Sequence, residues 1–312
     1  MEIGMGRDVV RRWVDNPLIT LEDLPVRSSG IWNAGIIRFD GQYVMLITVE
    51  TLEGHYCIYQ ARSRDGKHFH VHEKPFMTSR REGGAFGPYE SVGIRDPRIT
   101  PLDGTHYITY VAEGDHGLRL GLARTDDFVT AEPMAFISQV DYKNGILLPR
   151  KIRGRYALLD RPHEGVSIWI RYSDDLVFWG DSTVVMTPRG GYWDADVIGA
   201  AAPPIETERG WLLIYYGEKR TSAGPLVRLG AALLDAEDPA RVVARSNIPI
   251  LSPRERYERM GDVPNVVFSC GALLEDGGHI SVYYGASDSC ICLGRAALQE
   301  IVEICQEGES DA

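Results

Sequence analysis

The sequence predicts an all-β fold, a five-bladed β-propeller, and three observations carry this prediction. One unit recurs five times, a small turn followed by an apolar run that often ends in an acidic residue or arginine. The turn glycines of the five units are 63, 50, 56 and 67 residues apart, which is close to the repeat length of propeller blades. A further strand with period-two alternation follows each unit, and helix signals are weak. Equivalent strand ends should therefore meet around one central mouth.

The repeated units fix the expected elements in chain order. They read FDGQYVMLITVE from Phe39, LDGTHYITYVAE from Leu102, RGRYALLDRP from Arg153, ERGWLLIYYG from Glu208 and DGGHISVYYG from Asp276. We expect the inner strands to pass near Ile36, Pro97, Ile146, Ala201 and Phe268. Short helical turns are expected only at residues 20–24 and 299–307, and residues 180–193 should be a loop or a short strand.

Composition and charge limit the classes of protein. The 312 residues are 44% hydrophobic and 25% charged, as in ordinary globular proteins, and no linker interrupts the repeat. We expect one five-bladed β-propeller domain over residues 1–312, with short N-terminal and C-terminal extensions. The formal net charge of −11 disfavours nucleic acid and anionic membranes as partners. No apolar run reaches the ~18 residues of a spanning helix, and MEIGMGRDVVRRW lacks a signal core, so a cytoplasmic location is expected.

Cysteine and histidine usage gives no strong metal signal. The five cysteines are odd in number and lack framework spacing, which favours reduced thiols. Cys290 and Cys292 lie two apart on one strand, unlike a zinc knuckle, and His68, His70 and His72 fit an exposed outer strand better than a closed metal site. We therefore predict no metal site. No nucleotide or flavin motif is present either, so no organic cofactor is expected.

The segment GIRDPRIT is the first candidate for chemistry. Asp96 precedes Pro97, which favours an extended backbone, and the pair stands where a strand enters the second blade. A carboxylate at that place can project into the central mouth. The alternative is a simple turn, because Asp-Pro often starts one.

The second candidate is the densest basic stretch of this acidic chain, DYKNGILLPRKIRGRYALLDRP from Asp141. Arg161 follows an apolar strand, where a solvated charge is less expected, and Lys143 stands near the start of the stretch. Cations at strand ends suit a phosphate or carboxylate ligand, and a guanidinium binds such groups through two hydrogen bonds. Arg153 and Arg155 flank a turn glycine and fit a solvated hairpin.

Two polar residues at the ends of other strands complete the candidates. Asp288 ends YYGASD after the last apolar strand, and Asn33 stands in IWNAGIIRFDG before the first turn. Either side chain can hydrogen-bond a sugar, and either can instead cap a turn. Aromatic residues at strand ends, such as Tyr216, offer faces on which sugar rings stack, although most aromatics belong to the core.

Taken together, these segments resemble glycoside hydrolase family 130, whose members are five-bladed propellers acting on β-mannosides. The resemblance covers nearly the whole chain, from RRWVDNPLIT to ASDSCICLGRAAL. Its most specific parts occur in the family's order: DPRIT, KNGILLPRKIRGRYALLDRP, GAAAPPIETERGWLLIYYG, GAALLDAEDPARVVARSNIPIL and YERMGDVPNVVFSCGALL. The resemblance implies an inverting phosphorylase, which cleaves a β-mannoside with inorganic phosphate and releases α-mannose 1-phosphate. Substrates of β-1,2- or β-1,4-mannobiose, manno-oligosaccharide or mannosyl-glucose type are expected.

The resemblance also assigns roles position by position. Asp96 corresponds to the family's general acid, which is thought to protonate the leaving oxygen through a hydroxyl of the mannosyl ring. The expected sugar-binding residues are Asn33, Glu50, Arg98 and Asp288. The expected phosphate-binding residues, named the phosphate cradle below, are Lys143, Asn144, Arg161 and Tyr216. Inorganic phosphate is then a co-substrate, and assembly into a homo-oligomer is left open.

Several positions depart from the family pattern and keep alternatives open. Arg95 stands where a glutamate is common, Lys143 where an arginine is common, Tyr216 at a usual histidine and Val227 at a usual phosphate-binding tyrosine. An inverting hydrolase would need a second carboxylate as base, and Glu50, Glu113 and Glu218 are the candidates. A phosphorylase needs cations instead, and Lys143 and Arg161 supply them. We favour phosphorolysis, with a β-mannoside hydrolase and a non-catalytic carbohydrate-binding propeller as alternatives; the acid at Asp96 disfavours the latter.

Overall fold

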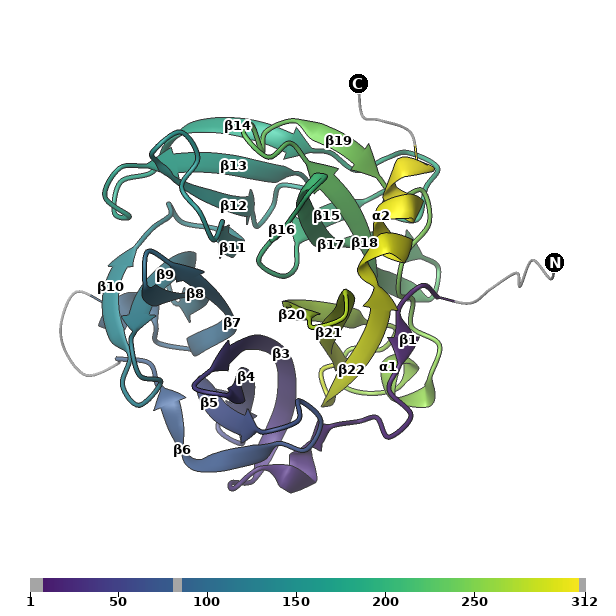
Figure 1. The fold of residues 1–312 in the computed structure, drawn as a ribbon. Coiled ribbons are helices and arrows are strands. Elements are labelled where there is room, and N and C mark those ends of the chain that lie inside the picture. The colour runs from purple at the N-terminus through teal and green to yellow at the C-terminus, as the bar shows by residue number, and fades with distance from the viewer. Residues whose placement is uncertain (1–7, 81–85, 309–312) are drawn as a thin grey trace.

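Short antiparallel sheets arranged in a ring form the fold (Figure 1). The computed structural model describes residues 8–80 and 86–308. Blade 1 contains β3 (Ser28–Phe39), β4 (Gln42–Thr51), β5 (Tyr56–Ser63) and β6 (His70–Met77). Blade 2 contains β7 (Gly93–Leu102), β8 (Thr105–Gly114), β9 (Gly117–Thr125) and β10 (Glu132–Phe136). A single parallel bridge, Tyr56 to Gly93, links these two blades.

The remaining three blades follow in chain order, and an N-terminal strand closes the ring. Blade 3 contains β11 (Tyr142–Leu147), β12 (Tyr156–Pro162), β13 (Ile168–Ser173) and β14 (Gly180–Met186). Blade 4 contains β15 (Val197–Ala200), β16 (Ile205–Thr207), β17 (Gly210–Thr221), β18 (Gly224–Leu234) and β19 (Val242–Arg245). Blade 5 contains β20 (Val267–Glu275), β21 (His279–Ala286) and β22 (Cys290–Ala297), against which β1 (Arg11–Arg12) and β2 (Ile19–Thr20) pair.

The predicted all-β propeller is therefore confirmed, together with the expected inner strands. Ile36, Pro97, Ile146 and Phe268 lie in β3, β7, β11 and β20, and Ala201 directly follows β15. The expected helical turns appear as η1 (Leu21–Asp23) and α2 (Leu298–Gln306), while η2 (Gly87–Tyr89) and α1 (Arg256–Arg259) were not anticipated. Among the described residues, no helix is long and apolar enough to cross a membrane.

The core is divided into five apolar layers, one between each pair of neighbouring blades. Leu46 of β4 packs with Ile108 of β8 between blades 1 and 2, and Leu213 of β17 packs with Leu159 of β12 between blades 3 and 4. Each sheet is thus buried on both faces, which explains why the repeated runs are apolar almost throughout. Near the axis the inner strands approach closely: a Cβ on Gly35 would lie 2.6 Å from the carbonyl oxygen of Pro97.

Candidate active site

A repeated backbone irregularity occurs where three inner strands carry polar residues. In β3, β7 and β11 the register with the second strand shifts at the same relative place, as at a β-bulge. Asn33, Asp96 and Asn144 sit at these shifts with φ values of 47°, 56° and 61°. Asn and Asp tolerate this left-handed conformation better than other residues with a side chain, which explains why they occupy the three positions.

Asp96 is held by contacts from two blades. Its side chain is buried, and Oδ1 accepts a hydrogen bond of 2.8 Å from Nδ2 of Asn33. Its backbone N–H donates to Oγ1 of Thr48 at 2.9 Å, and Oδ2 lies 3.2 Å from Nη1 of Arg95. Asn33 of β3 and Asp96 of β7 are therefore brought together as the sequence predicted for sites at one mouth, and both carboxylate oxygens have a donor.

The charges around Asp96 favour its carboxylate. Burial opposes ionisation, but the guanidiniums of Arg95 and Arg98, the hydrogen bond from Asn33 and the ammonium of Lys143 outweigh it and lower the pKa of Asp96 below its usual value. The carboxyl must therefore gain its proton within the reaction cycle if it acts as an acid.

A group of cations lies beside Asp96 in blade 3. Lys143 and Arg161 are direct neighbours on the antiparallel strands β11 and β12, so two like charges face each other. Nζ of Lys143 makes no hydrogen bond or ion pair with the residues that the structure describes. Burial, with the positive charges of Arg161 and Arg95, lowers the pKa of Lys143 to about 8. This arrangement is unfavourable alone and becomes favourable when an anion binds between the cations.

The guanidinium of Arg161 is fixed in place before any ligand arrives. Its Nε donates to the hydroxyl of Tyr216 at 3.1 Å, and its Nη1 donates to the carbonyls of Pro162 (3.0 Å), His163 (2.8 Å) and Gly165. Its Nη2 has no hydrogen-bond partner within residues 8–80 and 86–308. One donor edge of an oriented guanidinium thus remains for an anion.

Tyr216 joins blade 4 to this cation group. It is buried on β17, and burial raises the pKa of its hydroxyl above the usual value although Arg161 acts in the opposite direction. A Cβ on Gly199 would lie 2.4 Å from the Tyr216 ring, so a glycine at that place is required for the ring to fit. Three members of the predicted phosphate cradle, Lys143, Arg161 and Tyr216, are therefore adjacent. Asn144 is buried at the β11 bulge beside them.

Two predicted sugar-binding residues, Asn33 and Asp288, interact with Asp96. Oδ1 of Asn33 is buried and has no hydrogen-bond partner among the residues that the structure describes, so it can accept a hydrogen bond from a hydroxyl. Burial and the carboxylates of Asp96, Asp262 and Glu50 raise the pKa of Asp288 to about 7, in spite of Arg95. A protonated Asp288 donates a hydrogen bond where an ionised one only accepts, which suits a site lined with hydroxyl ligands.

Arg98 differs from the other predicted sugar-binding residues, because its hydrogen bonds go to backbone carbonyls. Its Nε donates to the carbonyl of Ala201 at 2.9 Å, and its Nη1 donates to the carbonyl of Asp96 at 3.0 Å. The side chain is fully buried, and its Nη2 has no hydrogen-bond partner in the described part of the chain. Arg98 thus ties blade 2 to blade 4 beneath the acid, and its contact with sugar stays a prediction.

Arg95, a direct neighbour of Asp96, was not among the predicted site residues. Arg95 contacts Asp96 and also donates from Nε to Oε2 of Glu113 at 2.8 Å. The sequence placed Arg95 next to the acid but gave no means of seeing that Glu113, on the following strand, also binds Arg95.

Val227, at the position where the family resemblance expects a tyrosine, is buried in the apolar layer between blades 4 and 5 and offers no polar group.

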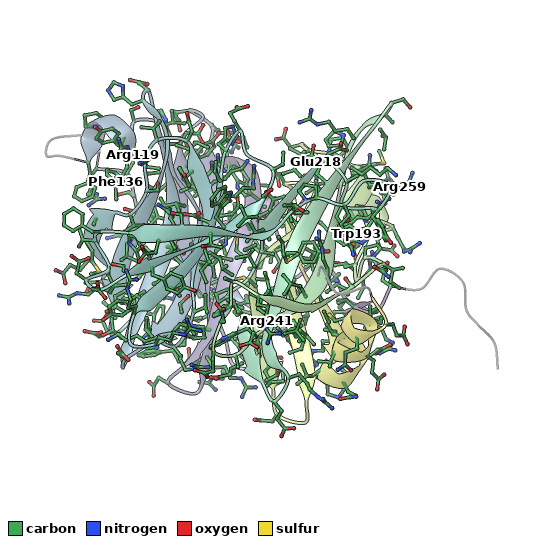
Figure 2. All side chains as sticks on the ribbon, turned by 90° about the horizontal axis from the view of Figure 1, so that it is seen from above. Arg119, Phe136, Trp193, Glu218, Arg241 and Arg259 are labelled. Carbon is green, nitrogen blue, oxygen red and sulfur yellow. The ribbon has the colours of Figure 1, made fainter. Side chains whose placement is uncertain are left out.

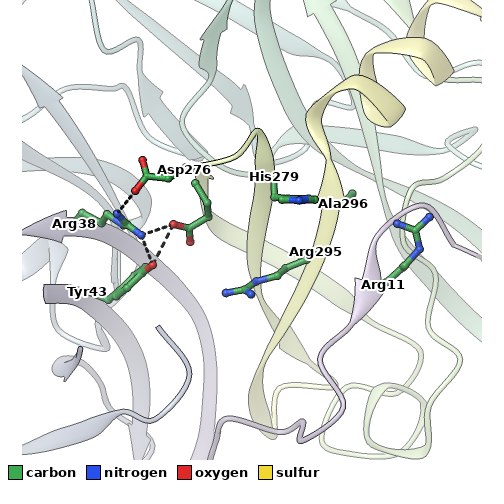
Figure 3. A pocket seen from close by; sticks show the side chains of 8 residues that line it. Arg11, Arg38, Tyr43, Asp276, His279, Arg295 and Ala296 are labelled. Atoms are coloured by element: carbon green, nitrogen blue, oxygen red, sulfur yellow. Dashed lines mark hydrogen bonds and ion pairs between the residues drawn. The ribbon is translucent and has the colours of Figure 1, made fainter. Parts of the chain in front are cut away.

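Other candidate sites lie away from Asp96. A hollow of about 490 Å³ at the far ends of β3 and β20 is lined by Arg11, Arg38, Tyr43, Glu275, Asp276, His279, Arg295 and Ala296 (Figure 3). Arg38 there pairs with Glu275 at 2.7 Å and with Asp276 at 3.5 Å. None of the predicted site residues lines this hollow.

The two faces of the ring can be told apart in the view turned by 90° from Figure 1. Glu218 lies toward one face of the ring and Arg241 toward the other (Figure 2).

The other residues considered for a metal site are His68, His70, His72 and the five cysteines. His70 and His72 lie on β6, which pairs only with β5 at the outer edge of blade 1, and Nδ1 of His68 lies 2.8 Å from Oδ2 of Asp65. All five cysteines are buried and free. Within the described part of the chain, no three His, Cys, Asp or Glu side chains are placed to hold a metal ion.

Comparison with known proteins places the chain in a family. A family model described as β-1,4-mannooligosaccharide phosphorylase matches residues 10–307. The chain is 34% identical over 283 residues to a 1,2-β-oligomannan phosphorylase of Thermoanaerobacter sp. (strain X514), covering 88% of this chain and 92% of that protein. It is 40% identical over 232 residues to a β-1,2-mannobiose phosphorylase of the same organism, covering 73% of each.

A solved structure agrees with these matches. The β-1,2-mannobiose phosphorylase of Listeria innocua, in complex with β-1,2-mannobiose, superposes with a TM-score of 0.86 at 29% identity, covering 96% of this chain and 99% of that one. With a family model that spans almost its full length and relatives that align over most of it, the chain belongs to glycoside hydrolase family 130.

Proposed function

We propose that this protein is an inverting β-mannoside phosphorylase that transfers a mannosyl group from a β-mannoside to inorganic phosphate. The observation that carries the proposal is the cation group beside Asp96: Lys143 makes no hydrogen bond or ion pair with the described residues and lies directly opposite the pre-oriented Arg161. Phosphate is already an anionic nucleophile, so the site needs cations to hold it and one acid for the leaving group. The phosphorylases among the relatives support the same reaction.

In this mechanism the hydrogen phosphate dianion lies between Lys143 and Arg161. One phosphate oxygen forms a bond to the anomeric carbon while the glycosidic C–O bond breaks on the opposite face of the ring. The leaving oxygen takes a proton that originates from Asp96, and the proton that entered with phosphate restores the acid, so the cycle is balanced. Asn33 and Asp288 orient the mannosyl ring, because their free acceptor and protonated carboxyl face hydroxyl groups.

The propeller as a whole serves as the catalytic domain in this proposal. Asn33 comes from blade 1, Asp96 from blade 2, Arg161 from blade 3, Tyr216 from blade 4 and Asp288 from the turn after β21 of blade 5. Because the site draws on every blade, its geometry depends on closure of the ring by β1 and β2. The proposed partners are a β-mannoside and inorganic phosphate.

Dependence on inorganic phosphate tests the proposal. We expect β-mannobioses to be cleaved only when phosphate is present, with α-mannose 1-phosphate formed and phosphate consumed one for one. The product is identified by ³¹P and ¹H NMR, and β-1,2- and β-1,4-linked disaccharides are assayed in parallel. Free mannose released equally fast without phosphate would show a hydrolase, with a carboxylate such as Glu50 or Glu218 as base; Glu113 is engaged by Arg95.

The pKa of Lys143 predicts how phosphate binding responds to pH. Because burial lowers this pKa to about 8, the side chain is charged below that pH and loses its charge above it. We expect the KM for phosphate to rise above about pH 8, by roughly tenfold per pH unit once the ammonium is lost. Lys143→Arg keeps the charge at every pH and should remove the rise. A parallel rise in Lys143→Arg would assign the dependence to another group.

A further inference from the structure

Arg95 is shared between two carboxylates at the mouth. Its Nη1 lies 3.2 Å from Oδ2 of Asp96, and its Nε lies 2.8 Å from Oε2 of Glu113. Arg95 is paired with Val111 across β7 and β8, so Glu113, two residues further, is its diagonal neighbour on the same face. The side chains of Arg95, Asp96 and Glu113 are 20%, 6% and 28% exposed, so water screens this triad poorly.

The contact lies on an oxygen of the acid itself. Oδ1 of Asp96 is occupied by Asn33, which leaves Oδ2 as the oxygen that can carry a proton toward substrate, and Arg95 covers Oδ2. A guanidinium only donates, so this contact is much stronger with the ionised carboxylate than with a carboxyl group that carries a proton on Oδ2. Arg95 and a proton therefore compete for one oxygen.

The other charges facing Asp96 do not duplicate this contact. Arg98 reaches only its backbone carbonyl, and the Lys143 ammonium makes no hydrogen bond to it. Asp288 and the buried thiol of Cys270 also interact with it electrostatically. Of the ionisable groups around the acid, only Arg95 is hydrogen-bonded to its carboxylate among the described residues.

We propose that Arg95 is a positioning residue that sets the protonation state of Asp96, and that Glu113 tunes it by drawing Arg95 away. The proposal rests on Asp96 being the general acid of the proposed function. When Nη1 of Arg95 leaves Oδ2 and Arg95 keeps only its Nε contact with Glu113, Oδ2 is free to take the proton that enters with phosphate. When Arg95 is held by Asp96, the acid stays ionised and proton transfer stops. The Arg95 position, where the family commonly has a glutamate, thus links the acid to the charge at the rim of the mouth.

Removing the charge of Arg95 and removing the charge of Glu113 are expected to shift the titration of Asp96 in opposite directions. Removing the positive charge of Arg95 disfavours the carboxylate and raises the pH at which Asp96 titrates. Removing the negative charge of Glu113 leaves Arg95 wholly to Asp96 and lowers that pH. A residue with only a structural role would change activity in both variants without moving the titration.

The test is a ¹³C NMR titration of aspartate carboxyl carbons in the full-length protein, without substrate or phosphate. The Asp96 signal is identified by its loss in Asp96→Asn. We expect Asp96 to remain ionised between about pH 5 and pH 8 in the wild type, and its midpoint in Arg95→Gln to rise by at least one pH unit, about tenfold in the ionisation constant. Arg95→Lys should restore most of the wild-type behaviour, and Glu113→Gln should not raise the midpoint.

A matched control and a second variant keep the test decisive. Arg124→Gln removes an exposed guanidinium of the same blade, paired with Glu132, and should leave the Asp96 signal unchanged. If Arg95→Gln does not fold, the double variant Arg95→Gln/Glu113→Gln removes both charges and should show an Asp96 midpoint above that of the wild type. An Asp96 midpoint that is the same in wild type and in these Arg95 variants overturns the proposal. Because no phosphate is used, this outcome is independent of whether cleavage consumes phosphate.

Discussion

Asp96→Asn is expected to lower kcat/KM for a β-mannobiose by about a thousandfold or more, because an amide keeps the shape of the side chain but cannot supply the proton. The substituted side chain can keep its oxygen toward Nδ2 of Asn33, so the bulge in β7 should survive. Its amide nitrogen would face Nη1 of Arg95, which retains Glu113 as a partner. Turnover is measured by product formation at saturating phosphate, and folding by circular dichroism.

The leaving group separates loss of the acid from general damage to the site. An aryl β-mannoside with a good leaving group needs little protonation, so Asp96→Asn should retain most of its activity on that substrate. Asp40→Asn makes the same change of charge at the exposed turn after β3, in a left-handed conformation that asparagine accepts, and should leave both activities unchanged. Near wild-type cleavage of mannobiose by Asp96→Asn would assign the acid elsewhere.

Arg161→Ala is expected to raise the KM for phosphate by roughly tenfold to a hundredfold, the loss of one buried charge-assisted contact of about 1.5–3 kcal/mol. The KM for the disaccharide should change much less, since the donor edge of Arg161 serves the anion. Removing this positive charge also relieves its repulsion of Lys143 and raises the pKa of Lys143 above about 8. The alkaline rise in the phosphate KM should therefore move to higher pH in the variant.

The same substitution carries a structural cost that must be measured separately. Arg161→Ala removes the donor to the Tyr216 hydroxyl and to three carbonyls, so some loss of thermal stability is expected. Arg161→Lys retains a charge without the oriented second donor and should fall between wild type and alanine. Arg155→Ala removes a half-buried arginine of the β12 hairpin that forms ion pairs with Asp174 and Asp181, and it should leave both KM values unchanged. Equal increases in both KM values for Arg161→Ala would argue for general disorder of the site.

The fold could be predicted because its signal is local and repeated. Each apolar run after a turn glycine is buried on both faces between two blades, and the same requirement recurs five times. The inner strands could be placed for the same reason. The strands that complete blade 5 could not, because β1 spans only Arg11–Arg12 and its pairing with β22 connects residues almost 300 positions apart. The short α1 gave no periodic pattern to detect.

Part of the site could also be predicted from the sequence, and part of it could not. The sequence by itself indicated the candidates: Asn33 and Asp96 beside strands, the cations Lys143 and Arg161 of the basic stretch, and Asn144 through the family resemblance. Only the tertiary structure decided how they combine, since Arg161 meets Tyr216 from another blade and Arg95 is divided between Asp96 and Glu113. The physical reason is that electrostatics depends on distance and burial. Neighbours along the chain fix neither, and both are settled only when the five blades close into a ring.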